Sequence, residues 1–191
     1  MKKYEFTGET KTVSFLFEDV TLHRIQAITS FASVVAGELG GWIEKEENLS
    51  HEGKAWVWGN AKVWGNAEVC GDAEVCGDAE VSGNAWVSEN AVVRENAEVS
   101  GNAMVRKNAV VSENAEVFSV RHVLVIGPIG SRNAFTTFYH DKDNEITVQC
   151  GCFIGKIDKF LEKVAQTHGD SKYAQVYRKA VELAKLQILT D

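Results

Sequence analysis

A six-residue period runs through the middle of the chain, from Ala55 to Val117. Alanine opens each hexad, valine takes its third place, and Asn or Asp closes each of the first ten. The hexads read AWVWGN, AKVWGN, AEVCGD, AEVCGD, AEVSGN, AWVSEN, AVVREN, AEVSGN, AMVRKN and AVVSEN, followed by AEVFSV. Such regularity marks a repeat architecture, in which every copy adopts the same local structure.

The spacing within the hexad predicts a very short strand followed by a corner. Alanine and valine lie two residues apart, so in a strand they point to the same face. We expect the closing Asn or Asp to turn the chain, because these residues tolerate a positive φ. On this interpretation, Glu89, Glu95 or Lys107 can replace the usual glycine. An α-helix does not explain the pattern, since a period of six would spread the Asn residues around the helix.

Three hexads would form one triangular turn of 18 residues. This arrangement resembles the left-handed parallel β-helix of hexapeptide-repeat proteins, and the resemblance alone implies the handedness. The predicted fold is therefore mainly β, with a solenoid over residues 55–117. A β-rich cap over residues 1–54 would precede it, and a C-terminal α+β module with two helices over residues 118–191 would follow.

Residues 18 apart should stack in columns along the outside of the solenoid. One column would hold Lys62, Glu80, Glu98 and Glu116. The hexads carry ten acidic and four basic side chains, and the whole chain has a net charge of −7. This charge argues against direct nucleic-acid binding, although an acidic column can imitate nucleic acid towards a basic partner.

Two outward columns are apolar, with Trp86 above Met104 and Val92 above Val110. Exposed apolar patches usually mark contacts. These four residues would either be covered by the flanking segments or form an interface between subunits. By analogy with hexapeptide solenoids, we expect a homo-oligomer, most simply a trimer.

The N-terminal segment reads as a cap of short strands. Its strands are expected at residues 4–6, 13–17 and 22–28, with turns at Gly37, Gly40 and Gly41. An open solenoid end must be covered to prevent edge pairing. We therefore expect the cap to pack against the tryptophans of the first turn, Trp56, Trp58 and Trp64.

In the C-terminal segment the six-residue repeat ends, and longer strands and helices are expected instead. We expect a strand over 122–126, a loop over 127–133, and a hairpin of 136–140 with 146–150. Gly169 should end a first helix, and Asp170 or Ser171 should open a second. The expected buried faces are Ile157, Phe160, Leu161 and Val164 on the first helix, and Tyr173, Val176, Tyr177, Ala180, Val181 and Ala184 on the second.

The best candidate binding site lies in the GPIGSRN loop. Backbone N–H groups of Gly130 and Asn133, with the side chains of Ser131 and Arg132, suit a phosphate or carboxylate. Hydroxyl groups nearby would come from Thr136, Thr137 and Tyr139. The segment lacks the GKS or GKT of a phosphate-binding P-loop. An ordinary structured turn is the alternative interpretation.

Neither a metal nor a cofactor is expected. Cys150 and Cys152, with His168 downstream, have C-x-C rather than C-x-x-C spacing, so we interpret them as buried thiols. The N-terminus has no apolar run of a signal peptide, and no segment approaches 18 apolar residues. We therefore expect a cytoplasmic protein with reduced cysteines and no membrane contact.

Several flanking segments carry a second resemblance. KYEFTGETK, TLHRIQAI and GELGGWIEKEENLSHEGKAWV resemble the start of phage and prophage hexapeptide-repeat proteins of unknown function. VIGPIGSRNAFTTFY, VQCGCFIG and THGD are similar to a module of the same proteins. The resemblance covers nearly the whole chain and implies a mobile-element origin, but no reaction.

Three functions remain open on the sequence. The first is a non-catalytic counter-defence protein that sequesters a nucleotide-like signal or blocks a host defence protein. The second is a structural scaffold that oligomerises through the solenoid. The third is an acyltransferase, although such enzymes often use a histidine between subunits and residues 55–117 contain none.

Overall fold

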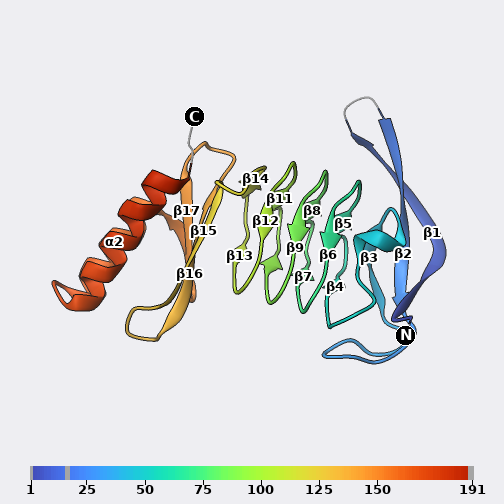
Figure 1. Ribbon diagram of the computed structural model, residues 1–191, viewed down its shortest axis with the longest axis horizontal. Coiled ribbons are helices and arrows are strands. Elements are labelled where there is room, and N and C mark those ends of the chain that lie inside the picture. The colour runs from blue at the N-terminus through green and yellow to red at the C-terminus, as the bar shows by residue number, and fades with distance from the viewer. Residues whose placement is uncertain (1, 16–17, 189–191) are drawn as a thin grey trace.

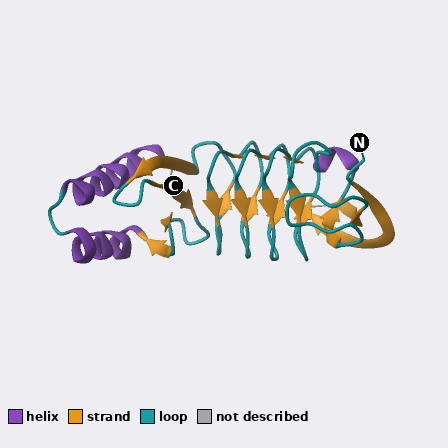
Figure 2. Ribbon diagram, turned by 90° about the horizontal axis from the view of Figure 1, so that it is seen from below, coloured by secondary structure: helices purple, strands orange, loops and turns teal. Residues whose placement is uncertain are grey.

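We describe residues 2–15 and 18–188 of a computed structural model. The molecule is elongated, with an N-terminal hairpin at one end, the repeats in the middle, and the C-terminal module at the other end (Figure 1). A view from below shows the rungs stacked along the long axis and the two helices beyond the last rung (Figure 2). The predicted mainly β solenoid is therefore confirmed.

Each hexad contributes one two-residue strand to one of three parallel sheets. Residues 18 apart are paired, as in Val92 with Val110 and Glu80 with Glu98, which confirms the predicted turn length. The three rows are β4 (Trp56–Val57), β7 (Glu74–Val75), β10 (Val92–Val93) and β13 (Val110–Val111); β5 (Lys62–Val63), β8 (Glu80–Val81), β11 (Glu98–Val99) and β14 (Glu116–Val117); and β6 (Glu68–Val69), β9 (Trp86–Val87) and β12 (Met104–Val105).

The alanines and valines of the hexads fill the interior of the solenoid. Every alanine at the first place and every valine at the third place of a hexad, from Ala55 to Val117, is at most 1% exposed. Burying a valine side chain fully contributes roughly 1.5–3 kcal/mol, so the stacked valines are the main source of stability. Alanine leaves room for the backbone to turn towards the next face.

The corners differ from the prediction in one respect. The residue with positive φ is the first of the corner pair, whether glycine, as in Gly59 (58°), or another residue, as in Glu89 (60°), Glu95 (63°) and Lys107 (64°). The Asn or Asp that follows does not have a positive φ at any described corner. A positive φ at the first central residue alone is the pattern of a type II′ turn.

The Asn and Asp side chains instead form hydrogen-bonded ladders up the corners. Asn66 donates to Asn84 at 3.2 Å, and Asn84 donates to Asn102 at 3.1 Å. A third pair joins Asn60 to Asp78 at 3.3 Å. At these corners the Asn or Asp links successive rungs through its side chain, and the residue before it has the positive φ of the turn.

The N-terminal cap extends one sheet of the solenoid. Its strands are β1 (Tyr4–Phe15), β2 (Glu18–Ala27) and β3 (Leu39–Ile43), and a 3-10 turn, η1, spans Glu46–Asn48. Strands β1, β2 and β3 are antiparallel neighbours, and β3 then pairs in parallel with β5. The predicted strand over 13–17 includes Leu16 and Phe17, which lie outside the described residues.

Two glycines of the cap serve close packing, which corrects their prediction as turn residues. Gly40 and Gly41 lie inside β3. A Cβ on Gly40 would lie 2.6 Å from the Trp56 ring, and one on Gly41 would lie 2.6 Å from Val57 Cγ1. Gly37 has a φ of 90° and suits a turn, as expected.

Tryptophans of the first turn join the cap to the solenoid, as predicted. Trp56 is 1% exposed, and its ring lies 5.4 Å from Phe31 and 6.1 Å from Tyr4, between centroids. Trp64 packs with Leu22 and Trp42 in a separate cluster. The cap thus covers the first rung with aromatic side chains.

The C-terminal module begins with a four-stranded antiparallel sheet. Its strands are β15 (Val123–Ile129), β16 (Ala134–His140), β17 (Ile146–Cys150) and β18 (Phe153–Lys156), in that order. The predicted hairpin of β16 and β17 is confirmed. The predicted loop over 127–133 is wrong at its start, since β15 continues through Pro128 to Ile129 on the edge of the sheet, where a missing N–H is tolerated.

Helices α1 (Ile157–His168) and α2 (Lys172–Gln187) cover one face of this sheet. Gly169 caps α1 and Ser171 caps α2, both as predicted. On α1 the predicted face is buried, with Leu161 only partly so. On α2, Tyr173 and Val176 are exposed, and Ala174 is buried in their place. The prediction for Tyr173 and Val176 was wrong because α2 carries apolar residues on two of its faces, and the sequence does not show which face packs on the sheet.

The other face of the sheet closes the last rung of the solenoid. Thr137 Oγ1 accepts a hydrogen bond from the Val110 N–H at 3.0 Å, and the Tyr139 hydroxyl lies 3.3 Å from Ser112 Oγ. Tyr139 is fully buried within the solenoid core cluster. The sheet therefore lies between the solenoid and the two helices, with one face packed on each.

Candidate functional site

A cavity of 200 Å³ opens in the C-terminal module, where two strand turns meet the helices. One turn joins β15 to β16 and the other joins β17 to β18. The polar and basic side chains of the lining are Ser131, Arg132, Lys163, Thr167 and His168, the aromatic ones are Phe153, Phe160 and Tyr177, and the thiols are Cys150 and Cys152. We call this space the module cavity.

Two glycines shape the module cavity. Gly130 has a φ of 72° and is buried, and a Cβ at this position would clash with the Tyr177 hydroxyl. Gly151, in the second turn, would place a Cβ 3.8 Å from an Arg132 guanidinium nitrogen. The two turns therefore lie side by side, with Arg132 reaching from the first to the second.

A short polar chain runs from the sheet to Tyr177 behind the cavity. Thr136 Oγ1 donates to Cys150 Sγ at 3.2 Å, and Cys150 Sγ lies 3.9 Å from the Tyr177 hydroxyl. Burial raises the pKa of Tyr177 to about 12, and the nearby Cys150 adds to this rise while Arg132 opposes it. The Tyr177 hydroxyl is consequently neutral at physiological pH and can act as a hydrogen-bond donor.

The lining of the module cavity carries basic groups and no carboxylate. Arg132 and Lys163 supply two positive charges, and His168 adds an imidazole ring with N–H donor capacity. The chain as a whole has a net charge of −7. A basic cavity on an acidic protein is a local reversal of charge, and it favours an anionic ligand.

Aromatic rings form the floor of the cavity. The His168 ring is stacked on the Tyr177 ring with centroids 5.8 Å apart and an angle of 29° between the planes. Phe160 meets Tyr177 edge to face at 5.5 Å. A planar ligand group can pack against such a surface.

The structure divides the predicted site residues between two faces of the sheet. Ser131 and Arg132 line the module cavity, and Gly130 and Asn133 form its turn, Asn133 with a φ of 48°. Thr136 does not line the cavity itself, but its hydroxyl donates a hydrogen bond to Cys150, which does. Thr137 and Tyr139 face the solenoid instead, as their bonds to Val110 and Ser112 show. We therefore leave these two out of the candidate site.

The separation follows from strand alternation, which the sequence already contained. Residues 136 and 138 of β16 point to one face, and residues 137 and 139 point to the other. The sequence analysis missed Lys163 and Tyr177, because nothing along the chain shows that the helices return to the GPIGSRN segment. Cys150, Cys152 and His168, which were considered together, do line one cavity. The prediction of buried thiols is wrong, since Cys152 is exposed and Cys150 is only partly buried at the end of β17. No group of these residue types in the described chain has a metal-binding arrangement.

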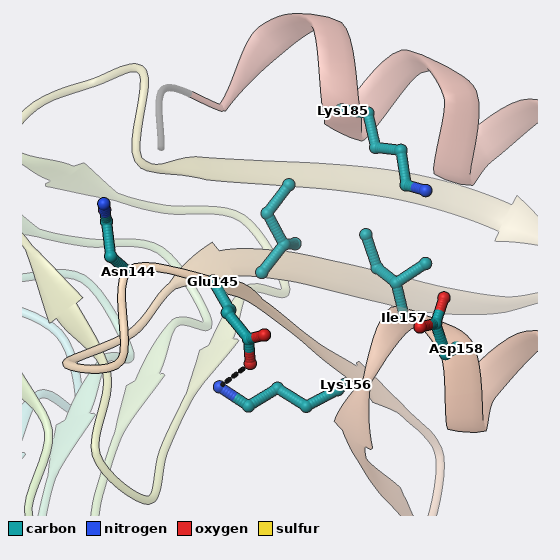
Figure 3. A pocket seen from close by; sticks show the side chains of 7 residues that line it. Asn144, Glu145, Lys156, Ile157, Asp158 and Lys185 are labelled. Carbon is teal, nitrogen blue, oxygen red and sulfur yellow. Dashed lines mark ion pairs between the residues drawn. The ribbon is translucent and has the colours of Figure 1, made fainter. Parts of the chain in front are cut away.

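A larger cavity of 420 Å³ lies at the other end of the helices, and Figure 3 shows the side chains that line it. Lys156 is held there by three carboxylates, at 2.7 Å from Asp141, 2.9 Å from Glu145 and 3.3 Å from Asp143. These hydrogen bonds and charges, working against partial burial, raise the pKa of Lys156. Its positive charge is already neutralised, so this cavity is a weaker candidate for an anion.

The predicted interface residues lie on two faces of the solenoid. Trp86 and Met104 stack in the row of β9 and β12, and Trp86 is 39% exposed. Val92 and Val110 stack in the row of β10 and β13 and are half-buried. Met104 also borders a cavity of 230 Å³ with Val120 and Val123 of the C-terminal module. The patch of Trp86 and Met104 is thus partly adjacent to a flanking segment. The trimer stays a prediction.

Comparison with known proteins gives one partial similarity. No protein-family model matches the chain. The chain is 37% identical over 62 residues to a protein of Escherichia coli (strain K12) described as "Uncharacterized acetyltransferase YdcK". The match covers 30% of this chain and 19% of the E. coli protein, so the chain spans about a fifth of that relative's length. None of the helices among the described residues is long and apolar enough to cross a membrane.

Proposed function

We propose that this protein is a non-catalytic binding protein whose C-terminal module holds a small anionic ligand of the nucleotide-like class. The observation that carries the proposal is the module cavity, which gathers Arg132, Lys163 and His168 without a carboxylate. The solenoid then acts as a rigid support for the module. Sequestration of such a ligand is the first of the functions considered from the sequence.

The geometry supports a ligand with an anionic group and a flat ring. Arg132 presents a guanidinium that can bind a phosphate or carboxylate through two parallel hydrogen bonds. The stacked rings of His168 and Tyr177 offer an aromatic surface nearby. Pockets for drug-sized ligands typically measure about 300–1,000 Å³, so a cavity of 200 Å³ suits a small anion or one end of a nucleotide.

A titration by two-dimensional NMR tests the proposal. Inorganic phosphate and adenosine monophosphate would be added separately to the ¹⁵N-labelled full chain. We expect amide shifts in residues 130–132 and 151–152, and stronger binding of the nucleotide if its ring packs on His168. Removing a charge-assisted hydrogen bond costs about 1.5–3 kcal/mol, so Arg132→Ala should weaken binding about ten-fold or more.

Two matched controls keep the test specific. Arg121→Ala removes an exposed arginine outside the cavity, and Lys159→Ala removes an exposed lysine one turn before Lys163 on the same helix. Neither should change the affinity. Shifts outside the cavity, or an affinity that Arg132→Ala leaves unchanged, would contradict the proposal.

The similarity to an acetyltransferase favours acyl transfer as a second candidate function. It is confined to 62 residues, fewer than a third of this chain. The hexads contain no histidine. His140 of β16 lies against the last rung, with its two ring nitrogens 2.9 Å from Glu116 O and 2.8 Å from Asn144 Oδ1. Release of free coenzyme A from acetyl-coenzyme A in the presence of amine acceptors would favour this candidate over sequestration.

The counter-defence role is a further step of the same proposal. It draws on the resemblance of the flanking segments to phage and prophage proteins, and on the acidic solenoid surface. If the module binds a nucleotide, co-expression with a nucleotide-signalled defence system should restore phage growth, and Arg132→Ala should abolish the effect. A protein that blocks a defence protein directly would keep its effect in Arg132→Ala and lose it when Glu80, Glu98 and Glu116 are changed to lysine.

A further inference from the structure

Helix α2 carries a line of apolar side chains that the rest of the described chain leaves uncovered. These side chains are Tyr173, Val176, Leu183 and Leu186, with exposed fractions of 37%, 41%, 49% and 84%. We call them the α2 stripe. Val176 and Leu183 also line a cavity beside Ile126 of β15, so the stripe lies next to the edge of the sheet.

The α2 stripe is symmetric along the helix. The intervals between its members are three, seven and three residues, so its centre falls between Lys179 and Ala180. Residues at these intervals lie on one flank of a helix with 3.6 residues per turn. An antiparallel copy of the same helix would set Val176 against the partner's Leu183, and Tyr173 against the partner's Leu186. The pattern is therefore complementary to itself under a two-fold rotation.

The charges around the centre of the stripe permit the same contact. Lys179 pairs with Glu182 at 2.7 Å, so the two charges cancel within each helix. Arg178 is paired with Asp170 at 3.2 Å, and it also lines the cavity beside the stripe. In an antiparallel pair, the two Lys179 residues come closest to each other at the centre. Each also lies within a turn of the partner's Glu182, so the two glutamates flank and offset the two lysines.

The neighbouring strand offers a second contact surface. Strand β15 has β16 as its one partner among the described strands, so its outer edge is open. An open edge strand presents unpaired N–H and C=O groups and tends to pair with another chain. Ile126 of this strand borders the cavity of the α2 stripe, which places both surfaces on one side of the module.

We infer that the protein forms a two-fold homodimer through the α2 stripe, with the β15 edges on the same side. The contact is isologous, because the same residues contribute from both copies. The inference does not rest on the proposed ligand site, since none of the four stripe residues lines the module cavity. It also differs from the trimer expected by analogy.

Sedimentation equilibrium of the full chain tests the inference. We expect a mass of twice the chain mass. Val176→Glu and Leu183→Lys should each raise the dimer dissociation constant about 30-fold or more, the effect of removing a central interface residue. The two changes in one chain should restore dimerisation, because each Glu would then face a Lys of the other copy. Both positions are exposed, so the fold should survive, which circular dichroism would check.

A matched control is Val35→Glu, which adds the same charge at an apolar position of the N-terminal cap that is 62% exposed. It should leave the dimer unchanged. A monomer at all accessible concentrations, a trimer, a dimer unaffected by Val176→Glu, or a double variant that stays monomeric would each overturn the inference. Loss of phosphate or nucleotide binding in a chain that remains dimeric would count against the proposed function alone.

Discussion

The two ends of the solenoid are closed by different means. At the N-terminal end, β3 continues a sheet of the solenoid, and backbone bonds such as Trp42 N–H to Ala61 O at 2.9 Å carry the ladder into the cap. At the C-terminal end, the sheet of β15–β18 turns a face towards the last rung, and side-chain hydroxyls of Thr137 and Tyr139 meet it. One cap prolongs the solenoid and the other covers it.

The difference explains where a binding site can form. The N-terminal cap uses its strands to extend the ladder and its aromatic rings to fill the first rung. The C-terminal cap needs only one face of its sheet for closure. Its second face is left for α1 and α2, and the module cavity forms between them. A covering sheet can thus close the solenoid with one side and form a cavity with the other.

Among the substitutions that test the difference between the two caps, we expect the largest loss of stability from one in the N-terminal cap. Trp56→Ala should lower the free energy of unfolding by about 3–5 kcal/mol, the usual effect of removing a large buried aromatic side chain. Trp56 is 1% exposed, and it contacts Tyr4, Phe31 and Trp58. Urea unfolding monitored by circular dichroism measures the change.

Trp86→Ala provides the control for this measurement. Trp86 sits in the same type of hexad but on the outside, 39% exposed. Its removal should cost under half as much. Equal losses in the two variants would show that the cap does not depend on Trp56.

A smaller effect should follow from the hydroxyl contact of the C-terminal cap. Thr137→Val keeps the shape of the side chain but leaves the Val110 N–H without its acceptor, which should cost about 1–3 kcal/mol. Thr137→Ser keeps the acceptor and should cost less. Thermal unfolding of both variants measures the difference, and a Val variant as stable as the Ser variant would show that the hydroxyl does not matter for closure.

We expect the smallest change in stability from the acidic column on the solenoid, which lies between the two caps. At the N-terminal end of the outer column Lys62 is paired with Glu80, while Glu98 and Glu116 follow without a basic residue in the column. Partial burial, together with the charges of Glu80 and Glu116, raises the pKa of Glu98. Folding therefore favours the protonated acid. Its contribution to stability is present below the pKa of the unfolded state and is lost as the pH rises through the pKa of the folded state.

Glu98→Gln should consequently stabilise the protein at pH 7 by a few tenths of a kcal/mol, about 0.3, because Glu98 is exposed and its repulsion is screened. The advantage should shrink as the pH falls through the pKa of Glu98, and it should shrink in high salt. Thermal unfolding of both proteins across pH 4–8 would show this, and a difference that is constant with pH would contradict it.

How much the sequence reveals depends on whether a residue's partners lie at a fixed distance along the chain. The rows of the solenoid followed from an interval of 18, and Val92 does pair with Val110. The corner geometry was assigned to the wrong residue, because composition alone does not separate a residue that adopts a positive φ from the neighbour whose side chain forms a ladder. The site was found in part, since Ser131 and Arg132 are local to one turn.

The rest of the site depends on how the helices pack over the sheet. Lys163 and His168 line the same cavity as Arg132 because α1 packs against β17 and β18, and no periodicity in the sequence fixes that packing. The same limit applies to α2, where Val176 was assigned to the buried face. Apolar residues on two flanks of one helix do not show which flank meets the sheet.

The equal rungs of the solenoid have a consequence for how such chains can change in length. Adding or removing 18 residues would move the two end modules apart or together by one rung and preserve their relative orientation, since residues 18 apart are equivalent. Adding or removing a single hexad would keep the interior intact but rotate the C-terminal module by a third of a turn about the long axis. The number of hexads therefore sets both the distance and the direction in which the module cavity faces the N-terminal hairpin.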